Sequence, residues 1–381
     1  MSLNLFNGDD DPLIRQFESA GFDEFSLKPQ KQINEYLIKY TLGRGSFAKV
    51  FMAIHQITGV KYALKRFRLK ELQRVENGVS QLEREISVMR HYKHPNIIKL
   101  HEVLFLEEFD TVYLVLDFAD AGSLKQLISH PIPVDEKMIR SIFHQILTAL
   151  NYLHQEGMIH QDIKPSNILL CSNGVSYLAD FGVGHSIQST EMVVGSPAYQ
   201  APEALTDGEG EAVSENPVKE DVWSLGVTLY ESLFFKLPFN GETVFEIIRN
   251  IRENPLSIPD NASPDVKDVI TKMLCIDQDK RLSVQELLNH PYFARPSGLV
   301  SIPVANIMYH SSEKSTEIMK YKAEICNNSW SFSRPGLSSP EVLRQINLEH
   351  NVEITAQTLI EEDTSKLPIV PLTSDGCCLI L

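Results

Sequence analysis

The sequence is poor in cysteine, and its cysteines are not grouped. Five occur in 381 residues, at positions 171, 275, 326, 377 and 378. Apart from the terminal pair, their spacing matches neither a disulfide framework nor a metal-binding motif. We therefore expect reduced thiols in a protein that faces the cytosol.

Positive charge is also scarce. The chain has 35 lysines and arginines against 50 aspartates and glutamates, a formal net charge of −15. This balance argues against a nucleic-acid binder that grips phosphates, whereas a nucleotide site needs only a few lysines and metal ions. The apolar share of 43% and the charged share of 22% are those of a globular protein. The length is enough for roughly two to three domains.

Signals for export or membrane insertion are missing as well. The start, MSLNLFNGDDD, lacks the basic and apolar regions of a secretory signal, and Ser2 breaks the N-myristoylation pattern. The most apolar stretch, residues 221–235, is too short for a bilayer and is interrupted by Asp221 and Glu231. We predict that it forms a buried central helix.

A polar motif between two apolar runs stands out, IHQDIKPSNILL at residues 159–170. Asp162 can accept the proton of an attacking hydroxyl, Lys164 can stabilise charge on a transferred phosphoryl group, and Asn167 can hold a magnesium ion. A polar surface turn ended by Pro165 would have a similar composition. The rest of the chain has to distinguish these two interpretations.

Upstream, the pattern indicates a phosphate site. β-rich apolar runs flank the G-R-G turn at residues 43–45. This predicts two strands joined either by a plain hairpin or by a loop whose amides approach phosphates. The next predicted strand carries Lys65, and a segment of helical periodicity at 80–92 carries Glu85. We expect a Lys65–Glu85 ion pair, with Glu83 as the alternative partner.

Two further motifs follow in order, D-F-G at residues 180–182 and A-P-E at 201–203. In this order and spacing, residues 34–293 resemble a eukaryotic protein kinase, although Ala48 replaces the third glycine of the glycine-rich loop. The resemblance implies transfer of the γ-phosphoryl group of ATP to protein hydroxyls, with Mg²⁺ as cofactor.

The resemblance also implies a fold class, α+β with the bilobal protein-kinase fold. A small antiparallel β-sheet N-lobe with one helix would span residues 34–118, and a larger, mainly helical C-lobe would span 119–293. Residues 1–33 would form an N-terminal extension. Residues 294–381 would form a regulatory or partly disordered tail.

By the same resemblance, site residues can be assigned one by one. The expected catalytic residues are Asp162, Lys164, Lys65 and Glu85, and the expected metal ligands are Asn167 and Asp180. The expected ATP contacts are Leu42, Gly43, Arg44, Gly45, Ser46, Phe47, Val50, Ala63, Lys65, Asp117, Ala119 and Leu169. The activation-loop candidates are Ser186, Ser189 and Thr190. Supporting contacts are expected for Asp221 with the catalytic-loop backbone, Arg281 with Glu203, and Ser196 with Asp162 and Lys164.

The residues within these motifs indicate a subgroup of protein kinases. Lys164 in D-I-K-P-S-N is the serine/threonine-kinase form. The runs at residues 195–205 and 221–260 are similar to the calmodulin-dependent kinase kinases and the liver kinase B group, which implies AMP-activated or SNF1-type kinases as substrates. The lack of a calmodulin-target helix favours liver kinase B. Gln161 replaces the arginine that binds activation-loop phosphate, which implies activity without that phosphate or an activating partner.

The last four residues, Cys378 to Leu381, form a C-a-a-X box whose leucine favours geranylgeranylation. An apolar tail that packs or frays is the alternative. Because one lipid anchors only marginally, Cys377 is a second lipidation candidate. We expect a cytoplasmic protein with membrane association through this lipid.

A different class of protein remains open, a membrane-anchored pseudokinase scaffold. Loss of Lys65, Asp162 or Asp180 would favour it, and all three are present. A small-molecule kinase of similar fold is disfavoured by the substrate platform at residues 195–203.

Overall fold

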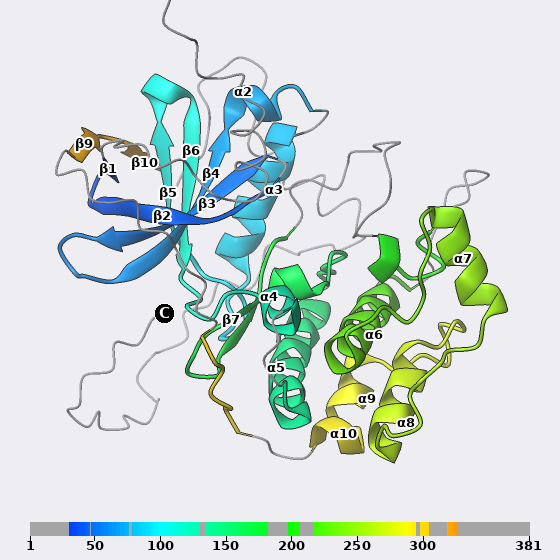
Figure 1. Cartoon of the computed structure of the whole chain (residues 1–381). Coiled ribbons are helices and arrows are strands. Elements are labelled where there is room, and N and C mark those ends of the chain that lie inside the picture. Colours follow the sequence, from blue (N-terminus) through cyan, green and yellow to red (C-terminus); the bar gives the residue numbers. More distant parts are fainter. Residues whose placement is uncertain are drawn as a thin grey trace, which may run out of the picture.

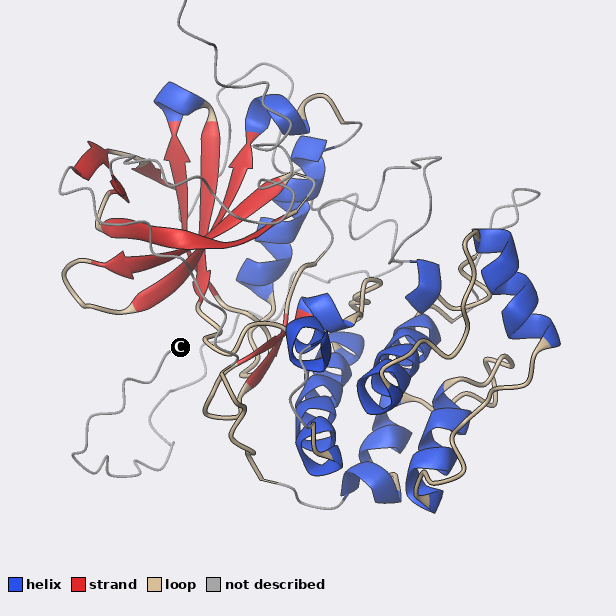
Figure 2. Cartoon of the chain, viewed as in Figure 1, coloured by secondary structure: helices blue, strands red, loops and turns tan. Residues whose placement is uncertain are grey.

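The computed structural model has the expected two lobes (Figure 1). The N-terminal lobe is a curled β-sheet with one long helix, and the C-terminal lobe is mainly helical (Figure 2). The predicted fold class is confirmed. The structure describes residues 30–45, 47–75, 78–129, 134–181, 197–205, 216–294, 298–304 and 318–326.

An eight-stranded sheet forms the N-terminal lobe. Its strands are β1 (Gln30–Ile33), β2 (Tyr36–Arg44), β3 (Ala48–His55), β4 (Lys61–Arg68), β5 (Leu100–Leu106), β6 (Thr111–Asp117), β9 (Ile318–Tyr321) and β10 (Glu324–Ile325). Their spatial order is β10-β5-β6-β4-β3-β2-β1-β9. Neighbouring strands are antiparallel, as predicted, except that β1 and β9 run parallel.

Both faces of this sheet are covered. The inner face packs on α3 (Gly78–His91), whose Leu82, Ile86 and Met89 are buried at helical spacing, as the sequence predicts. Residues of the outer face form a separate small core, which includes the buried Leu64 and Tyr113. Alternate residues of one strand therefore meet different surroundings.

The C-terminal lobe holds most of the helices. Its elements are α4 (Leu124–Ser129), α5 (Glu136–Gln155), η2 (Pro165–Asn167), β7 (Ile168–Leu170), β8 (Ser176–Leu178), η3 (Pro197–Tyr199), α6 (Val218–Phe234), α7 (Val244–Glu253), α8 (Pro264–Met273), α9 (Val284–Leu288) and α10 (Pro291–Ala294). In α6, all twelve residues from Asp221 to Ser232 are buried, so the predicted buried central helix is confirmed. Among the described helices, none is long and apolar enough to cross a bilayer.

Segments outside the expected kinase domain add to the sheet. β1 lies within the expected N-terminal extension, and β9 and β10 lie within the expected tail (Figure 1). The tail first follows the C-terminal lobe, where Ser141 Oγ donates to the Gly298 carbonyl at 2.8 Å. It then reaches the N-terminal lobe, where Asn34 Nδ2 donates to Ala323 O at 3.1 Å and Ala323 N donates to Asn34 Oδ1 at 2.8 Å. The short β9–β10 segment thus bonds to both edges of the sheet.

Candidate active site

Lys65 on β4 lies between two carboxylates. Its ammonium donates to Glu85 Oε1 at 2.7 Å and to Asp180 Oδ1 at 2.9 Å. Glu85 comes from α3, and Asp180 follows β8, so three distant segments meet here. The expected Lys65–Glu85 pair is present, and the alternative with Glu83 is wrong.

Burial and charge together set the protonation of this cluster. Burial alone lowers the pKa of Lys65, but Asp180 and Glu85 outweigh it and raise the pKa above its usual value. Burial raises the pKa of Glu85, whose Oε2 is buried without a hydrogen-bond partner among the described residues. Burial also acts to raise the pKa of Asp180, but Lys65 reverses this and holds it low. Lys65 is therefore cationic and Asp180 anionic at neutral pH.

Asp162, Lys164 and Asn167 form a second cluster on one loop. Lys164 Nζ lies 2.8 Å from Asp162 Oδ2. Asn167 Nδ2 donates to the Asp162 carbonyl at 2.9 Å and to its Oδ2 at 2.7 Å. Pro165 opens η2 after the extended Lys164, and a proline is favoured at a first helical position. This single turn folds Asn167 back onto Asp162.

The loop that carries Asp162 is held in place by Asp221 of α6. This carboxylate is fully buried and accepts from the backbone amides of His160 at 2.9 Å and Gln161 at 2.8 Å. Gln161 has a φ of 63°, a conformation that needs such support in a residue other than glycine. His154 Nε2 lies 2.8 Å from Asp221 Oδ2. The expected contact of Asp221 with this loop is confirmed, and His154 adds a further partner for its carboxylate.

The A-P-E motif is tied to the C-terminal lobe by Arg281. Its guanidinium bonds both oxygens of Glu203, at 2.6 Å and 3.2 Å, and the side chain is fully buried. It also lies over the Trp223 ring, 5.0 Å from the centroid. The expected Arg281–Glu203 pair is therefore present and bidentate.

A cavity of about 380 Å³ separates the lobes next to Lys65. This volume is in the range of small-molecule sites. Eight of the expected ATP contacts line it, namely Leu42, Gly43, Val50, Ala63, Lys65, Asp117, Ala119 and Leu169. The expected contacts Arg44, Gly45 and Phe47 are described but do not line it.

Gly43 lines the cavity with its backbone open to it. Its φ is not in the left-handed region, and a Cβ placed on it would have no atom within 4 Å. Neither backbone conformation nor packing therefore requires glycine there. Close approach of a phosphate group to the backbone would require it.

Sequence reasoning missed some residues of the cavity wall. Gln126 on α4 lines the cavity and accepts from the backbone amide of Ser123 at 2.9 Å. Met89 and Ile98 also line it. The three-residue spacing between Ser123 and Gln126 was a sequence signal for their contact. No sequence signal distinguishes Met89 and Ile98 from ordinary apolar core residues.

Several expected residues lie outside the described part of the chain. Ser46 of the glycine-rich loop and Gly182 of D-F-G are among them. The remaining ones are Ser186, Ser189, Thr190, Ser196, Cys377 and Cys378.

The donor set fits Mg²⁺ bound together with phosphates. No cluster of three or more His, Cys, Asp or Glu side chains occurs in the described residues that could hold a metal unaided. Asn167 and Asp180 both line the cavity and offer oxygen atoms, and the Asn167 amide nitrogen is already engaged by Asp162. Mg²⁺ is commonly held by one or two protein oxygens with substrate phosphates and waters.

The protein has two lobes with a cavity of nucleotide size between them. A lysine between carboxylates and a nearby Asp–Lys–Asn loop lie at this cavity. This arrangement is typical of enzymes that transfer phosphoryl groups. A family model for the protein kinase domain matches residues 36–293. The chain therefore belongs to the protein kinase family.

Among curated relatives, the serine/threonine-protein kinase STK11 of Gallus gallus is 34% identical over 289 residues, which cover 72% of this chain and 64% of that protein. STK11 of Homo sapiens is 32% identical over 286 residues, with 73% and 65% covered. Serine/threonine-protein kinase GRIK2 of Arabidopsis thaliana is 33% identical over 280 residues, with 71% and 68% covered. The chain spans about 64% of the length of the first of these. The expected resemblance to serine/threonine kinases near the liver kinase B group is confirmed.

Proposed function

We propose that this protein transfers the γ-phosphoryl group of ATP to serine and threonine hydroxyls of other proteins. The observation that carries the proposal is the position of Lys65, 2.7 Å from Glu85 and 2.9 Å from Asp180 at the wall of the cavity. A lysine fixed in this way can bind phosphate oxygens without first reorganising.

The second cluster would perform the proton transfer. Lys164 and Asn167 orient the Asp162 carboxylate, which would accept the proton of the substrate hydroxyl as its oxygen bonds to phosphorus and ADP departs. Lys164 would also stabilise the transferred group. Mg²⁺, when bound through Asn167 and Asp180, would neutralise phosphate charge. Most of the rate gain would come from positioning and electrostatics.

The pseudokinase scaffold is the second candidate. Both clusters are assembled in the structure, which favours the enzyme. Purified protein that fails to bind Mg-ATP would favour the scaffold instead.

We further propose that the substrates include activation loops of AMP-activated or SNF1-type kinases, on the strength of the similarity to STK11 and GRIK2. The test is phosphorylation of an inactive AMP-activated-type kinase domain by purified protein with Mg-ATP. Transfer to the activation-loop threonine, absent with Asp180→Ala, is expected. Transfer to casein but not to this substrate would reject the substrate class and leave the kinase activity standing.

We also propose that the kinase activity does not require a phosphate on the protein's own activation loop. Gln161 offers no guanidinium at the position next to Asp162, and its backbone is already fixed by Asp221. We expect phosphatase-treated protein to keep most of its activity. Loss of most activity on that treatment would instead show that phosphate orders the loop, and recovery with an added protein would reveal an activating partner.

The lipid at Cys378, and a second one at Cys377, remain proposals from the C-a-a-X pattern. Incubation of the full chain with geranylgeranyltransferase and labelled geranylgeranyl diphosphate should label it. The Cys378→Ser variant should stay unlabelled, and a lack of label on the unaltered chain would remove this proposal.

A further inference from the structure

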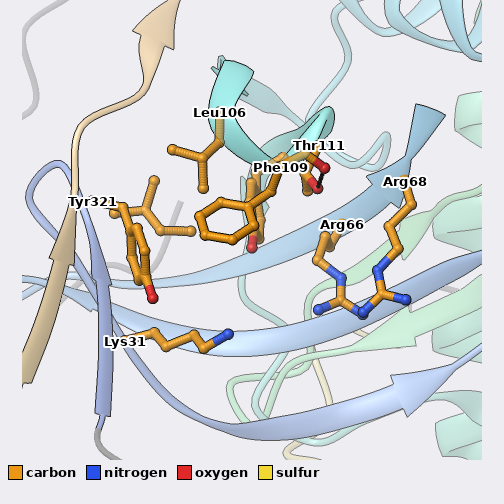
Figure 3. A pocket seen from close by; sticks show the side chains of 9 residues that line it. Lys31, Arg66, Arg68, Leu106, Phe109, Thr111 and Tyr321 are labelled. Carbon is orange, nitrogen blue, oxygen red and sulfur yellow. Dashed lines mark hydrogen bonds between the residues drawn. The ribbon is translucent and has the colours of Figure 1, made fainter. Parts of the chain in front are cut away.

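The outer face of the N-terminal sheet has a cavity of about 320 Å³ that the phosphotransfer site does not use (Figure 3). It lies between β1, β4, the turn from β5 to β6, and β9 of the tail. Its basic wall consists of Lys31, Arg66 and Arg68. We call this cavity the outer pocket.

Arg66 is the strongest sign that the outer pocket receives an anion. It is half-buried, and it makes no ion pair within the described part of the chain. Its guanidinium instead lies 5.3 Å from the centroid of the Phe51 ring and is hydrogen-bonded to Tyr113. Burial lowers its pKa from the usual value. Glu71, the partner of Arg68, attracts Arg66 electrostatically without forming an ion pair with it. A partly desolvated cation without a directly bonded counter-ion is costly, and a bound anion would relieve that cost.

Arg68 adds a second guanidinium to the same wall. The two arginines are two residues apart on β4, so their side chains leave the same face of the strand. Figure 3 shows their guanidinium ends next to each other, and the ammonium end of Lys31 facing the same space. Arg68 pairs with Glu71 at 3.0 Å, but this pair is largely exposed. Adjacent guanidinium groups match the oxygens of a phosphate group.

The opposite wall is apolar. Phe109 is 50% exposed there, and its ring meets the Tyr321 ring edge-on with 5.4 Å between centroids. Leu106 and Ile33 complete this wall. Inorganic phosphate or a wholly polar lipid headgroup would leave these side chains in water. A ligand with an apolar group next to its phosphate would cover both walls.

We propose that the outer pocket binds a phosphorylated peptide segment of another protein. The phosphate lies against Arg66, Arg68 and Lys31, and a neighbouring apolar side chain of the peptide packs on Phe109 and Tyr321. Phosphate suits the basic wall better than a carboxylate because it carries more charge and three acceptor oxygens. Since Tyr321 comes from β9, the tail must be docked on the sheet for the site to be complete.

The test uses the full chain and a capped peptide, Gly-Leu-phosphoserine-Leu-Gly, titrated by calorimetry at fixed salt. Binding should be at least about tenfold stronger than that of the unphosphorylated peptide or of inorganic phosphate. Arg66→Gln should weaken it on the order of tenfold, and so should Arg68→Gln, whose exposed position makes misfolding a minor risk. Arg252→Gln, an exposed arginine on α7, is the matched control and should bind as the unaltered protein does.

Further variants separate the two walls. Arg66→Lys keeps the charge but loses the planar fork and should also weaken peptide binding. Phe109→Ala should weaken the peptide about fivefold and leave inorganic phosphate unchanged. Melting temperatures of all variants establish that they fold.

Three results would overturn the proposal. The first is equal binding of both peptides, and the second is binding of inorganic phosphate as tightly as the phosphopeptide. The third is arginine-dependent binding to vesicles containing phosphatidylinositol 4-phosphate without binding of the peptide, which would assign the pocket to a membrane. None of these readouts depends on kinase activity.

Discussion

Lys65 and Arg66 are consecutive residues of β4, and they carry the same charge into opposite surroundings. Lys65 faces the cleft between the lobes, where two carboxylates bond it. Arg66 faces the outer pocket, where an aromatic ring and a tyrosine hydroxyl contact it and no carboxylate of the described residues pairs with it.

By the two proposals above, one strand would serve two ligands, one on each of its faces. The paired lysine is held in one geometry before a nucleotide arrives, which suits a reaction that depends on positioning. Arg66 would gain a directly bonded counter-ion only when the proposed phosphopeptide binds, which would suit recognition. The alternation of a β-strand is what keeps the two environments apart.

Among the tests of this comparison, the largest effect should come from removing the cation on one face and then on the other. Lys65→Met should lower kcat/KM for protein phosphorylation by about 10²–10³-fold, because it removes an electrostatic partner of the phosphates. Arg66→Met, one residue along, should leave it within about twofold. Steady-state kinetics with casein would measure both. Equal losses would show that the two faces are not independent.

A second comparison sets Arg66 against a paired arginine. Arg281→Gln leaves Glu203 without its bidentate partner inside the protein and should lower the free energy of unfolding by about 3–5 kcal/mol. Arg66→Gln should change it by less than about 1 kcal/mol, because no ion pair is broken. Chemical denaturation would provide both values. A larger loss for Arg66 than for Arg281 would contradict the contrast between paired and unpaired charge.

The Glu85→Gln variant tests the carboxylate hold on Lys65 through the pH dependence of the phosphorylation rate. The pKa of Glu85 is raised by burial, so its charge, and with it the ionic hold on Lys65, is lost first as the pH falls, while Asp180 stays ionised. At neutral pH the variant should be about tenfold slower. Its rate should fall less than that of the unaltered enzyme between neutral pH and pH about 5. Parallel pH profiles for the two proteins would argue against this role.

The smallest effect concerns the tail that completes the outer pocket. Asn34 has a φ of 48°, which glycine adopts easily, so Asn34→Gly removes the two bonds to Ala323 without backbone strain. We expect a loss of about 1 kcal/mol in unfolding free energy and faster proteolysis near residues 318–326. Phosphopeptide binding should weaken while phosphoryl transfer stays nearly unchanged. Unaltered proteolysis would mean that these bonds do not hold the tail.

The contacts among the expected catalytic residues could be predicted because the proposed chemistry restricts both residue type and spacing. Asp162, Lys164 and Asn167 lie on one short loop, so their meeting depends on a single turn at Pro165. To predict the Lys65–Glu85 pair, the sequence also had to indicate a strand followed by a helix whose apolar face points at the sheet. The periodicity of residues 80–92 supplied that information.

The tail strands could not be predicted in the same way. Asn34 and Ala323 are separated by 289 positions, and nothing in the short sequence IMKY of β9 identifies its partner strand. The outer pocket shares this limitation, because Tyr321 reaches it only through β9. Alternation along β4 does place Arg66 opposite Lys65, but the lack of an ion pair at Arg66 among the described residues is a property of the folded chain.

The most direct test measures nucleotide binding and phosphoryl transfer on the same samples of the unaltered protein and of Asp162→Asn. Because Asp162 does not line the cavity, the variant should bind Mg-ATP about as tightly as the unaltered protein. Its transfer to casein should be about 10²–10⁴-fold slower, the usual contribution of a general base. Equal transfer rates, or an unaltered protein that binds Mg-ATP yet phosphorylates neither casein nor an inactive kinase domain, would contradict the proposed kinase mechanism.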